Sequence, residues 1–228
     1  MTTRTLTIIA SVAAVLFLVV VGIFAFVPNA TLILSKGPIV VLSGKAGDQA
    51  EDPFDGCRAS RVATGSASIG GPFELVSEDG VTVTDKDVFT KPTILYFGYT
   101  FCPDVCPLDN MRNADALRLL DERGYDAQAA FISIDPERDT PEIVKEFTDL
   151  FHENMIGMTG TPEQVKAASM AYKTYYKKQD GDPEYYLVDH STFAYLVFPE
   201  IGFVDFFKRE DTPEQMADRV ACFIDAAK

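Results

Sequence analysis

The chain has 228 residues, of which 47% are hydrophobic, and its formal net charge is −14 at pH 7. This length and composition suit one domain of ordinary size with a full hydrophobic core. Arg4 is the one charged residue within residues 1–28, so the rest of the chain carries 19 basic and 34 acidic side chains, a net charge of −15. Such a domain repels phosphate backbones, which argues against nucleic acid as a partner. We interpret the acidity as a solubility feature rather than as attraction to a cationic partner.

The N-terminal stretch from Leu6 to Val27 is apolar and uncharged over 22 positions, which is long enough for a helix to cross a bilayer. A cleaved signal peptide is the alternative, but its apolar region should be shorter and should end in small residues. We therefore predict an uncleaved membrane anchor over residues 1–28, with Arg4 inside and the following domain outside. Because no Arg-rich and Ser-rich transit peptide is present, we expect a single pass through a bacterial inner membrane, with the domain in the periplasm.

Residues 29–68 are weakly patterned and are predicted to form a tether, with an ordered fragment around residues 53–57. The domain is expected to occupy residues 69–228. Its first element is a predicted hairpin of strands 73–76 and 81–84, which are joined by a turn that ends in glycine. Asp85 follows as a candidate cap of a short helical turn.

Residues 93–99 form an apolar run that predicts a buried strand, and the run stops shortly before Cys102 and Cys106. Helical periodicity then continues to about Gly124, and residues 129–134 predict a second buried strand. The later predicted elements are helices that begin at Thr140-Pro141, Thr161-Pro162 (ending near Tyr176) and Thr212-Pro213, and strands at 185–188, 192–198 and 202–207, the last two as a hairpin. This order predicts an α/β sandwich with a mixed sheet. A parallel pair through strand 93–99 would place both cysteines at its carboxyl end, where α/β sheets usually carry a site.

Cys102 and Cys106 are separated by three residues and lie where a strand passes into a helix. At a helix start, the backbone N–H groups and the macrodipole favour thiolate over thiol. Two thiols at this spacing suit copper(I) or zinc, and they equally suit reversible disulfide formation. We favour these reactive interpretations over two buried cysteines that merely fill space.

The chain contains two histidines that could complete a metal site. His152 follows a helix and is predicted to be an ordinary exposed residue. His190 lies between two predicted strands beside Asp189, whose carboxylate could orient the imidazole ring. Two thiolates and one imidazole form a trigonal site suited to copper(I), and an added oxygen or water would accommodate copper(II). Spacing alone does not show that His190 reaches the cysteines.

The block at residues 96–107, with a proline after each cysteine and three residues between the cysteines, resembles the core motif of the Sco/SenC family of copper-delivery proteins for cytochrome c oxidase. Further blocks similar to the family's follow in its order at residues 133–141, 157–161, 172–176 and 188–191. The resemblance covers roughly residues 69–226, and the predicted N-terminal anchor is also typical of the family.

The resemblance implies a thioredoxin-like fold with an added N-terminal hairpin, and a copper site made of Cys102, Cys106 and His190. It implies delivery of copper to the dinuclear copper centre of cytochrome c oxidase subunit II, with other copper chaperones as possible partners. It also places Asp135 near the site, as a docking or outer-sphere group. The residues themselves favour ordinary turn and helix-cap roles for Asp135 and Thr140.

Cys57 and Cys222 are not part of the family motif. In an oxidising compartment they could form a disulfide that ties the tether to the last helix, with a stabilisation of roughly 2–4 kcal/mol. The alternative is two unpaired cysteines, with Cys222 facing the core.

Three functions remain in view from the sequence. The preferred one is a copper chaperone, and the main alternative is a periplasmic thiol-disulfide oxidoreductase or redox sensor that acts on the oxidase subunit's cysteines. Against the alternative, thioredoxin-like enzymes usually place two residues between their cysteines and need no remote histidine. A peroxiredoxin-like peroxidase shares the fold, but no residue set around Cys102 clearly supports it.

Overall fold

The computed structural model of the chain describes residues 52–58, 69–182 and 184–228. The predicted anchor and most of the predicted tether lie outside these residues. Within the part that is described, no helix is long and apolar enough to cross a bilayer.

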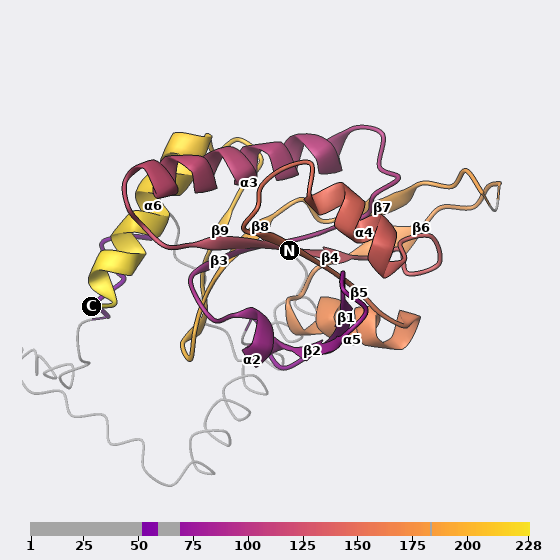
Figure 1. Cartoon of the computed structure of the whole chain (residues 1–228), viewed down its shortest axis with the longest axis horizontal. Coiled ribbons are helices and arrows are strands. Elements are labelled where there is room, and N and C mark those ends of the chain that lie inside the picture. The colour runs from indigo at the N-terminus through magenta and orange to yellow at the C-terminus, as the bar shows by residue number, and fades with distance from the viewer. Residues whose placement is uncertain (1–51, 59–68, 183) are drawn as a thin grey trace, which may run out of the picture. The chain divides into compact units, whose positions relative to one another are not determined.

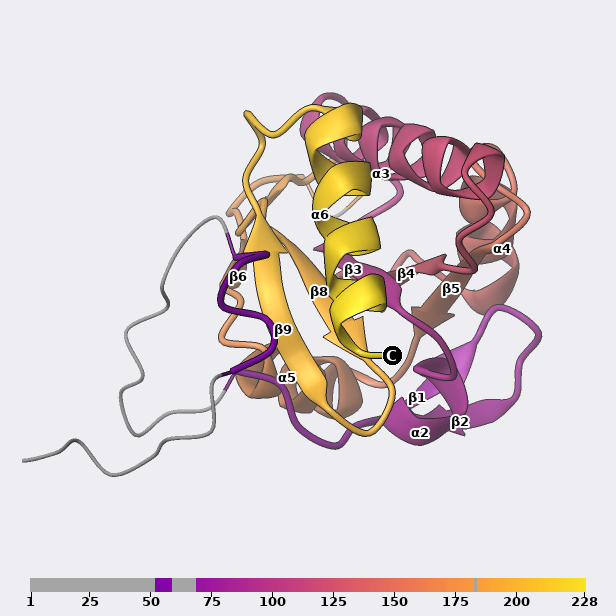
Figure 2. The same cartoon turned by 90° about the vertical axis from the view of Figure 1, so that its left-hand side faces the viewer.

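A mixed β-sheet runs through the described domain (Figures 1 and 2). Its seven strands follow the order β2-β1-β5-β4-β3-β8-β9. They are β1 (Glu74–Ser77), β2 (Thr82–Thr84), β3 (Thr93–Gly98), β4 (Gln128–Ser133), β5 (Met155–Thr159), β8 (Ala194–Phe198) and β9 (Gly202–Phe207). The central strands β3, β4 and β5 are parallel, and the outer pairs are antiparallel. The mixed α/β class, the N-terminal hairpin and the parallel pair through β3 are thereby confirmed.

Helices cover both faces of this sheet (Figure 1). The helices α3 (Val105–Glu122), α4 (Pro141–Thr148) and α6 (Pro213–Ala226) lie on one face, α5 (Pro162–Ala171) lies on the other, and the short α2 (Asp85–Val88) follows the β1–β2 hairpin. The predicted helix starts are confirmed, because Thr140, Thr161 and Thr212 each accept a hydrogen bond from the backbone N–H three residues later and each precedes a proline. Every residue of β3 and β4 is buried, as expected for parallel strands covered on both faces.

A small antiparallel hairpin stands apart from the main sheet. It pairs β6 (Tyr176–Lys178) with β7 (Val188–His190) and projects beyond the body of the domain in Figure 1. The strand predicted at 185–188 is thus placed two to three residues too early, and β6 is not predicted at all. The helix predicted to reach Tyr176 instead ends at Ala171, because Lys173 adopts a positive φ of 55° and the chain turns there into β6.

Strand β5 is a second element absent from the sequence prediction. Its sequence Met-Ile-Gly-Met-Thr is short, lacks alternation and contains a glycine, all of which weaken the strand signal. Gly157 is required there because a β-carbon would collide with the Val144 side chain of α4. In a sequence pattern, a glycine required by packing indicates a break in the chain rather than a strand.

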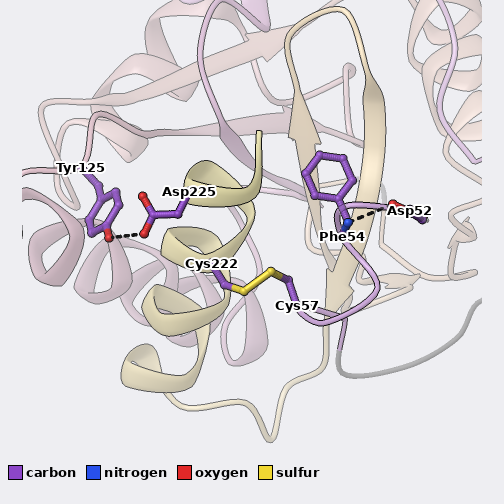
Figure 3. Close-up of a disulfide and its surroundings, with 6 residues drawn as sticks. All are labelled: Asp52, Phe54, Cys57, Tyr125, Cys222 and Asp225. Atoms are coloured by element: carbon purple, nitrogen blue, oxygen red, sulfur yellow. Dashed lines mark hydrogen bonds between the residues drawn. A yellow bond between two sulfur atoms is a disulfide. The ribbon is translucent and has the colours of Figure 1, made fainter. Parts of the chain in front are cut away.

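Cys57 and Cys222 form a disulfide that attaches residues 52–58 to helix α6 (Figure 3), with their Cα atoms 5.6 Å apart. The Phe54 ring packs beside the same helix, with its centroid 5.2 Å from that of Phe223. The Arg58 side chain donates to the Val204 carbonyl of β9 at 3.3 Å. The ordered fragment expected around residues 53–57 therefore exists and is part of the domain.

Candidate metal centre

The cysteine pair lies where β3 passes into α3. Cys102 is in the connecting loop, and Cys106 is the second residue of α3. Both thiols are free, and Cys102 is 8% exposed while Cys106 is fully buried. The Cys106 backbone N–H donates to the Cys102 sulfur at 3.4 Å, so the helix start presents a donor to a thiolate, as the sequence predicts.

Gly98, the last residue of β3, makes room for the second sulfur. A β-carbon at this position would lie 3.0 Å from the Cys106 Sγ and 2.8 Å from the Tyr96 ring. The sequence signal for this role is a glycine ending a buried strand four residues before the first cysteine.

His190 ends strand β7, and its Nε2 lies 3.3 Å from the Cys106 Sγ. Its Nδ1 lies 2.8 Å from the Ser191 carbonyl oxygen, which can only accept a hydrogen bond. In the neutral imidazole this acceptor places the proton on Nδ1, which leaves the Nε2 lone pair free to bind a metal beside the sulfurs. The idea that Asp189 orients this ring is wrong, because the Asp189 carboxylate accepts from the Gln179 side chain instead.

Two tyrosine rings hold the imidazole edge-on. Tyr96 and Tyr99 make T-shaped contacts with His190 at centroid distances of 6.2 and 5.8 Å. The Tyr99 hydroxyl also accepts a hydrogen bond from the Val188 backbone N–H at 3.2 Å. This bond ties β7 to the loop of residues 99–104 between β3 and α3, which we call the cysteine loop. These tyrosines were not predicted as site residues, because their side chains read as ordinary apolar members of a buried strand.

The two thiols differ sharply in acidity. The pKa of Cys102 is lowered, chiefly because the Cys106 thiol donates a hydrogen bond to its thiolate. The backbone N–H groups of Asp104 and Cys106 add to this effect, against the cost of burial. The pKa of Cys106 is raised because its proton is held in that same hydrogen bond and because the side chain is buried. The two thiols therefore titrate as one coupled pair, whose first proton is lost more readily than that of an ordinary thiol and whose second is held more tightly.

The structure brings together the three residues singled out as candidate ligands. The ligand atoms of Cys102, Cys106 and His190 all lie within 4.8 Å of one another. Two sulfur atoms and one imidazole nitrogen form a soft, three-coordinate donor set. Such a set suits copper(I) better than zinc, because zinc is usually bound by four ligands.

His152 is not the exposed residue that the sequence predicts. Its side chain is only 8% exposed, and its Nε2 lies 3.2 Å from an Asp121 carboxylate oxygen. Its Nδ1 accepts from the Asn154 backbone N–H at 3.1 Å. Both nitrogens are thus engaged in local packing between α3 and the start of β5, and His152 does not belong to the cysteine cluster.

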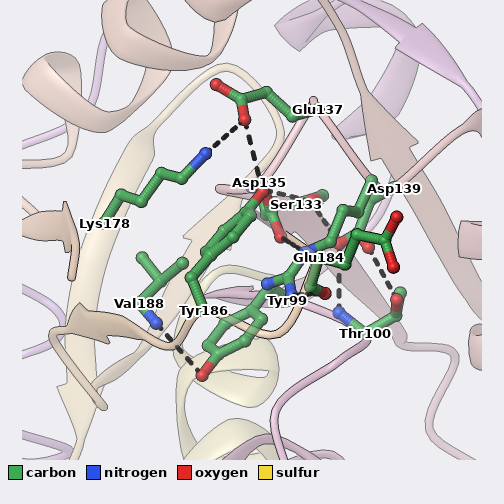
Figure 4. Close-up of polar contacts among 11 residues, drawn as sticks. Tyr99, Thr100, Ser133, Asp135, Glu137, Asp139, Lys178, Glu184, Tyr186 and Val188 are labelled. Carbon is green, nitrogen blue, oxygen red and sulfur yellow. Dashed lines mark hydrogen bonds and ion pairs between the residues drawn. The ribbon is translucent and has the colours of Figure 1, made fainter. Parts of the chain in front are cut away.

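Two buried carboxylates support the loops around the cluster (Figure 4). Asp139 accepts hydrogen bonds from the Thr100 backbone N–H, the Thr100 hydroxyl and the Ser133 hydroxyl, which ties the cysteine loop to the end of β4. Burial raises the pKa of Asp139. Asp135 accepts from the Tyr186 hydroxyl at 2.5 Å and pairs with Arg138 at 2.6 Å. Asp135 is thus more than a turn residue, since it bonds to the segment that leads to His190.

The fold and the cluster together define a thioredoxin-like domain with a dithiol and a histidine at the carboxyl end of its central strand. The chain belongs to the SCO1/SenC family, whose model matches residues 61–225. It is 57% identical over 176 residues to Protein SenC of Rhodobacter capsulatus, which covers 77% of this chain and 79% of that protein.

Solved structures of relatives share the fold. The crystal structure of Arabidopsis thaliana ScoI with copper bound is 42% identical, with a TM-score of 0.66, and the match covers 69% of this chain and 99% of that one. The crystal structure of yeast Sco1 with copper bound is 37% identical, with a TM-score of 0.65, and the match covers 69% of this chain and 89% of that one.

Proposed function

We propose that this protein is a copper chaperone that delivers copper for assembly of the dinuclear copper centre of cytochrome c oxidase subunit II. The observation that carries the proposal is the convergence of the ligand atoms of Cys102, Cys106 and His190 within 4.8 Å. Relatives of the same fold have been crystallised with copper bound, and the family resemblance supplies the oxidase as the destination. Copper is the cargo in this account rather than a permanent cofactor.

The three ligands would play unequal parts in carrying the ion. Cys102 is the ready thiolate and keeps some exposure, so an incoming ligand of the acceptor reaches the copper from its side. Cys106 is fully buried and loses its proton when copper binds, which makes the affinity fall as the pH falls. His190 offers its Nε2 from a separate hairpin and completes the site.

We also propose that residues 1–28 anchor the protein in a bacterial inner membrane, with the domain in the periplasm. The uncharged run of 22 residues supports the anchor. The Cys57–Cys222 disulfide supports an oxidising compartment for the domain. Other copper chaperones would then supply the ion from within the same compartment.

A second candidate is a thiol-disulfide oxidoreductase that reduces the oxidase subunit's cysteines before copper arrives. The lowered pKa of Cys102, caused chiefly by the Cys106 thiol, favours this candidate, because the thiolate is the nucleophile in thiol-disulfide exchange. Such chemistry needs the two cysteines and does not need His190. The two candidates therefore predict different consequences of losing the histidine.

Copper titration of the full-length chain separates them. We expect the wild type to bind one copper(II) ion per chain, with a thiolate-to-copper(II) charge-transfer absorption band. His190→Ala should lower the affinity by at least about tenfold and shift the band, while both thiols remain free and redox-active. His152→Ala is the matched control, since it removes the chain's other histidine away from the cluster. Copper binding by His190→Ala that equals the wild type would contradict the proposal.

A further inference from the structure

The β6–β7 hairpin has no backbone pairing with the main sheet among the described residues. Its position over the cysteine loop therefore depends on its short connections to α5 and β8 and on side-chain contacts. This matters because His190 is the last residue of β7, whereas Cys102 lies in the β3–α3 loop and Cys106 in the first turn of α3. Whatever fixes the hairpin also fixes the third ligand relative to the first two.

The Arg138 side chain contacts both the β6–β7 hairpin and the cysteine loop. Its guanidinium carbon lies 3.6 Å from the ring centroid of Tyr186, a residue of the hairpin, and 4.8 Å from that of Phe101, the residue before Cys102. Its Nε donates to Asp135 at 2.6 Å, and its NH1 lies 3.4 Å from the Glu184 carbonyl oxygen of the hairpin. The side chain is 12% exposed, so these contacts are largely shielded from water.

Two neighbouring hydrogen bonds also hold the hairpin in place. The Tyr186 hydroxyl donates to Asp135, and the Val188 backbone N–H donates to the Tyr99 hydroxyl (Figure 4). Asp135 thus receives one bond from the hairpin and one from Arg138, its neighbour three residues along the chain. Arg138 is the one member of this group whose side chain also covers Phe101 of the cysteine loop.

We propose that Arg138 is a positioning residue for copper binding: its guanidinium, in contact with the rings of Tyr186 and Phe101, holds the β6–β7 hairpin on the cysteine loop and thereby fixes His190 beside Cys106. The inference rests on the proposed copper function. A planar guanidinium covers aromatic rings while its N–H groups reach Asp135 and Glu184, and a lysine ammonium cannot do both. Loss of the clamp would lower the fraction of molecules with His190 in place, and the apparent copper affinity falls with that fraction.

The test is a double-mutant cycle on the full-length, reduced chain, with copper(I) as the probe and a chromophoric copper(I) chelator as competitor. Arg138→Lys should weaken copper(I) binding about tenfold in the wild-type background. In the His190→Ala background it should change binding less than about twofold, since no third ligand remains to be positioned. The matched control is Arg118→Lys, which alters another arginine paired with an aspartate three residues away, about 18 Å from Cys106 along α3.

A second variant keeps the test decisive if Arg138→Lys unfolds, as judged by its thermal unfolding midpoint. Phe101→Leu removes the ring that the guanidinium contacts on the cysteine loop, at a position that is 53% exposed, so it leaves the core intact. It should weaken copper(I) binding about threefold, and again only when His190 is present.

The outcomes distinguish this inference from the proposed function. If Arg138→Lys and Phe101→Leu bind copper(I) like the wild type while His190→Ala binds it weakly, the positioning role is wrong and the copper site stands. An equal loss in both backgrounds also overturns the inference, because Arg138 would then act on the cysteines or on the fold. If His190→Ala itself matches the wild type, the proposed site is wrong and the positioning role falls with it.

Discussion

At the scale of single residues, the site depends on a missing side chain as much as on its ligands. The absence of a β-carbon at Gly98 leaves room at the end of β3 for the Cys106 sulfur and for the rings of Tyr96 and Phe131. The backbone there is ordinary extended strand, so the requirement is for space rather than for unusual torsion angles. The glycine is thereby part of the site without touching any metal.

Gly98→Ala should therefore damage the site and the fold together. The new methyl group would lie 2.8–3.0 Å from the Tyr96 ring, the Cys106 Sγ and the Phe131 ring, which is tighter than packed atoms tolerate. We expect a loss of about 1–3 kcal/mol in the free energy of unfolding, measured in urea, and weaker copper(I) binding. Gly181→Ala is the comparison, since a β-carbon there meets nothing within 4 Å and its backbone is outside the left-handed region. Copper binding by Gly98→Ala equal to that of the wild type would show that the sulfur does not need this space.

The unequal acidity of the two thiols gives a pH dependence with a definite sign. Because the pKa of Cys102 is lowered, mainly by the Cys106 thiol, its thiolate is already the main form below neutral pH. Its alkylation by iodoacetamide should thus proceed at nearly the same rate from about pH 6 to pH 8, whereas an ordinary thiol gains about tenfold in rate per pH unit below its pKa. Cys106, whose pKa is raised by the shared proton and by burial, should remain unmodified in the same peptides by mass spectrometry. A rate for Cys102 that climbs toward an ordinary thiol pKa would show that its thiolate is not stabilised.

At the scale of elements, the sequence predicts those parts whose signals are local. The buried run of β3 and the Thr-Pro starts of α4, α5 and α6 need no knowledge of the fold, and the structure confirms them. Strand β5 escapes prediction because its glycine, Gly157, is required by packing against the Val144 side chain of α4, and a sequence pattern does not show that packing. The distance from His190 to the cysteines escapes prediction for a similar reason, because it is set by the hairpin contacts and not by the sequence separation of 84 between Cys106 and His190.

The pairing of Cys57 with Cys222 is another long-range fact that spacing leaves open. The two residues are 165 positions apart, and the disulfide closes a loop around nearly the whole domain. Its position on α6 places it on a different element from the cysteine pair. We therefore infer that the disulfide stabilises the domain and has no role in binding the metal.

A Cys57→Ser, Cys222→Ser double variant should separate stability from copper binding. Removing the cross-link should lower the free energy of unfolding by about 2–5 kcal/mol, because the unfolded chain regains the freedom that the closed loop denies it. Urea unfolding measures this loss, and copper(I) affinity should stay within about twofold of the wild type. A large loss of copper affinity in a folded double variant would mean that the tether supports the site.

At the scale of the whole molecule, the chain combines an acidic domain with an N-terminal run that is expected to anchor it. The net charge of −14 disfavours binding to phosphate backbones, as expected from the sequence. The cysteine cluster lies at the carboxyl end of the central strand, where the β3–α3 loop and the β6–β7 hairpin meet. A partner that receives copper would thus approach this end of the domain.

X-ray absorption spectroscopy of the copper(I)-loaded, full-length chain reports the donor atoms themselves. We expect the copper to have two sulfur neighbours and one nitrogen neighbour with the outer-shell scattering of an imidazole. In His190→Ala the imidazole signal should vanish and the two sulfur neighbours should remain. A wild-type spectrum with sulfur neighbours alone, or with fewer than two sulfurs per copper, would contradict a site built from Cys102, Cys106 and His190.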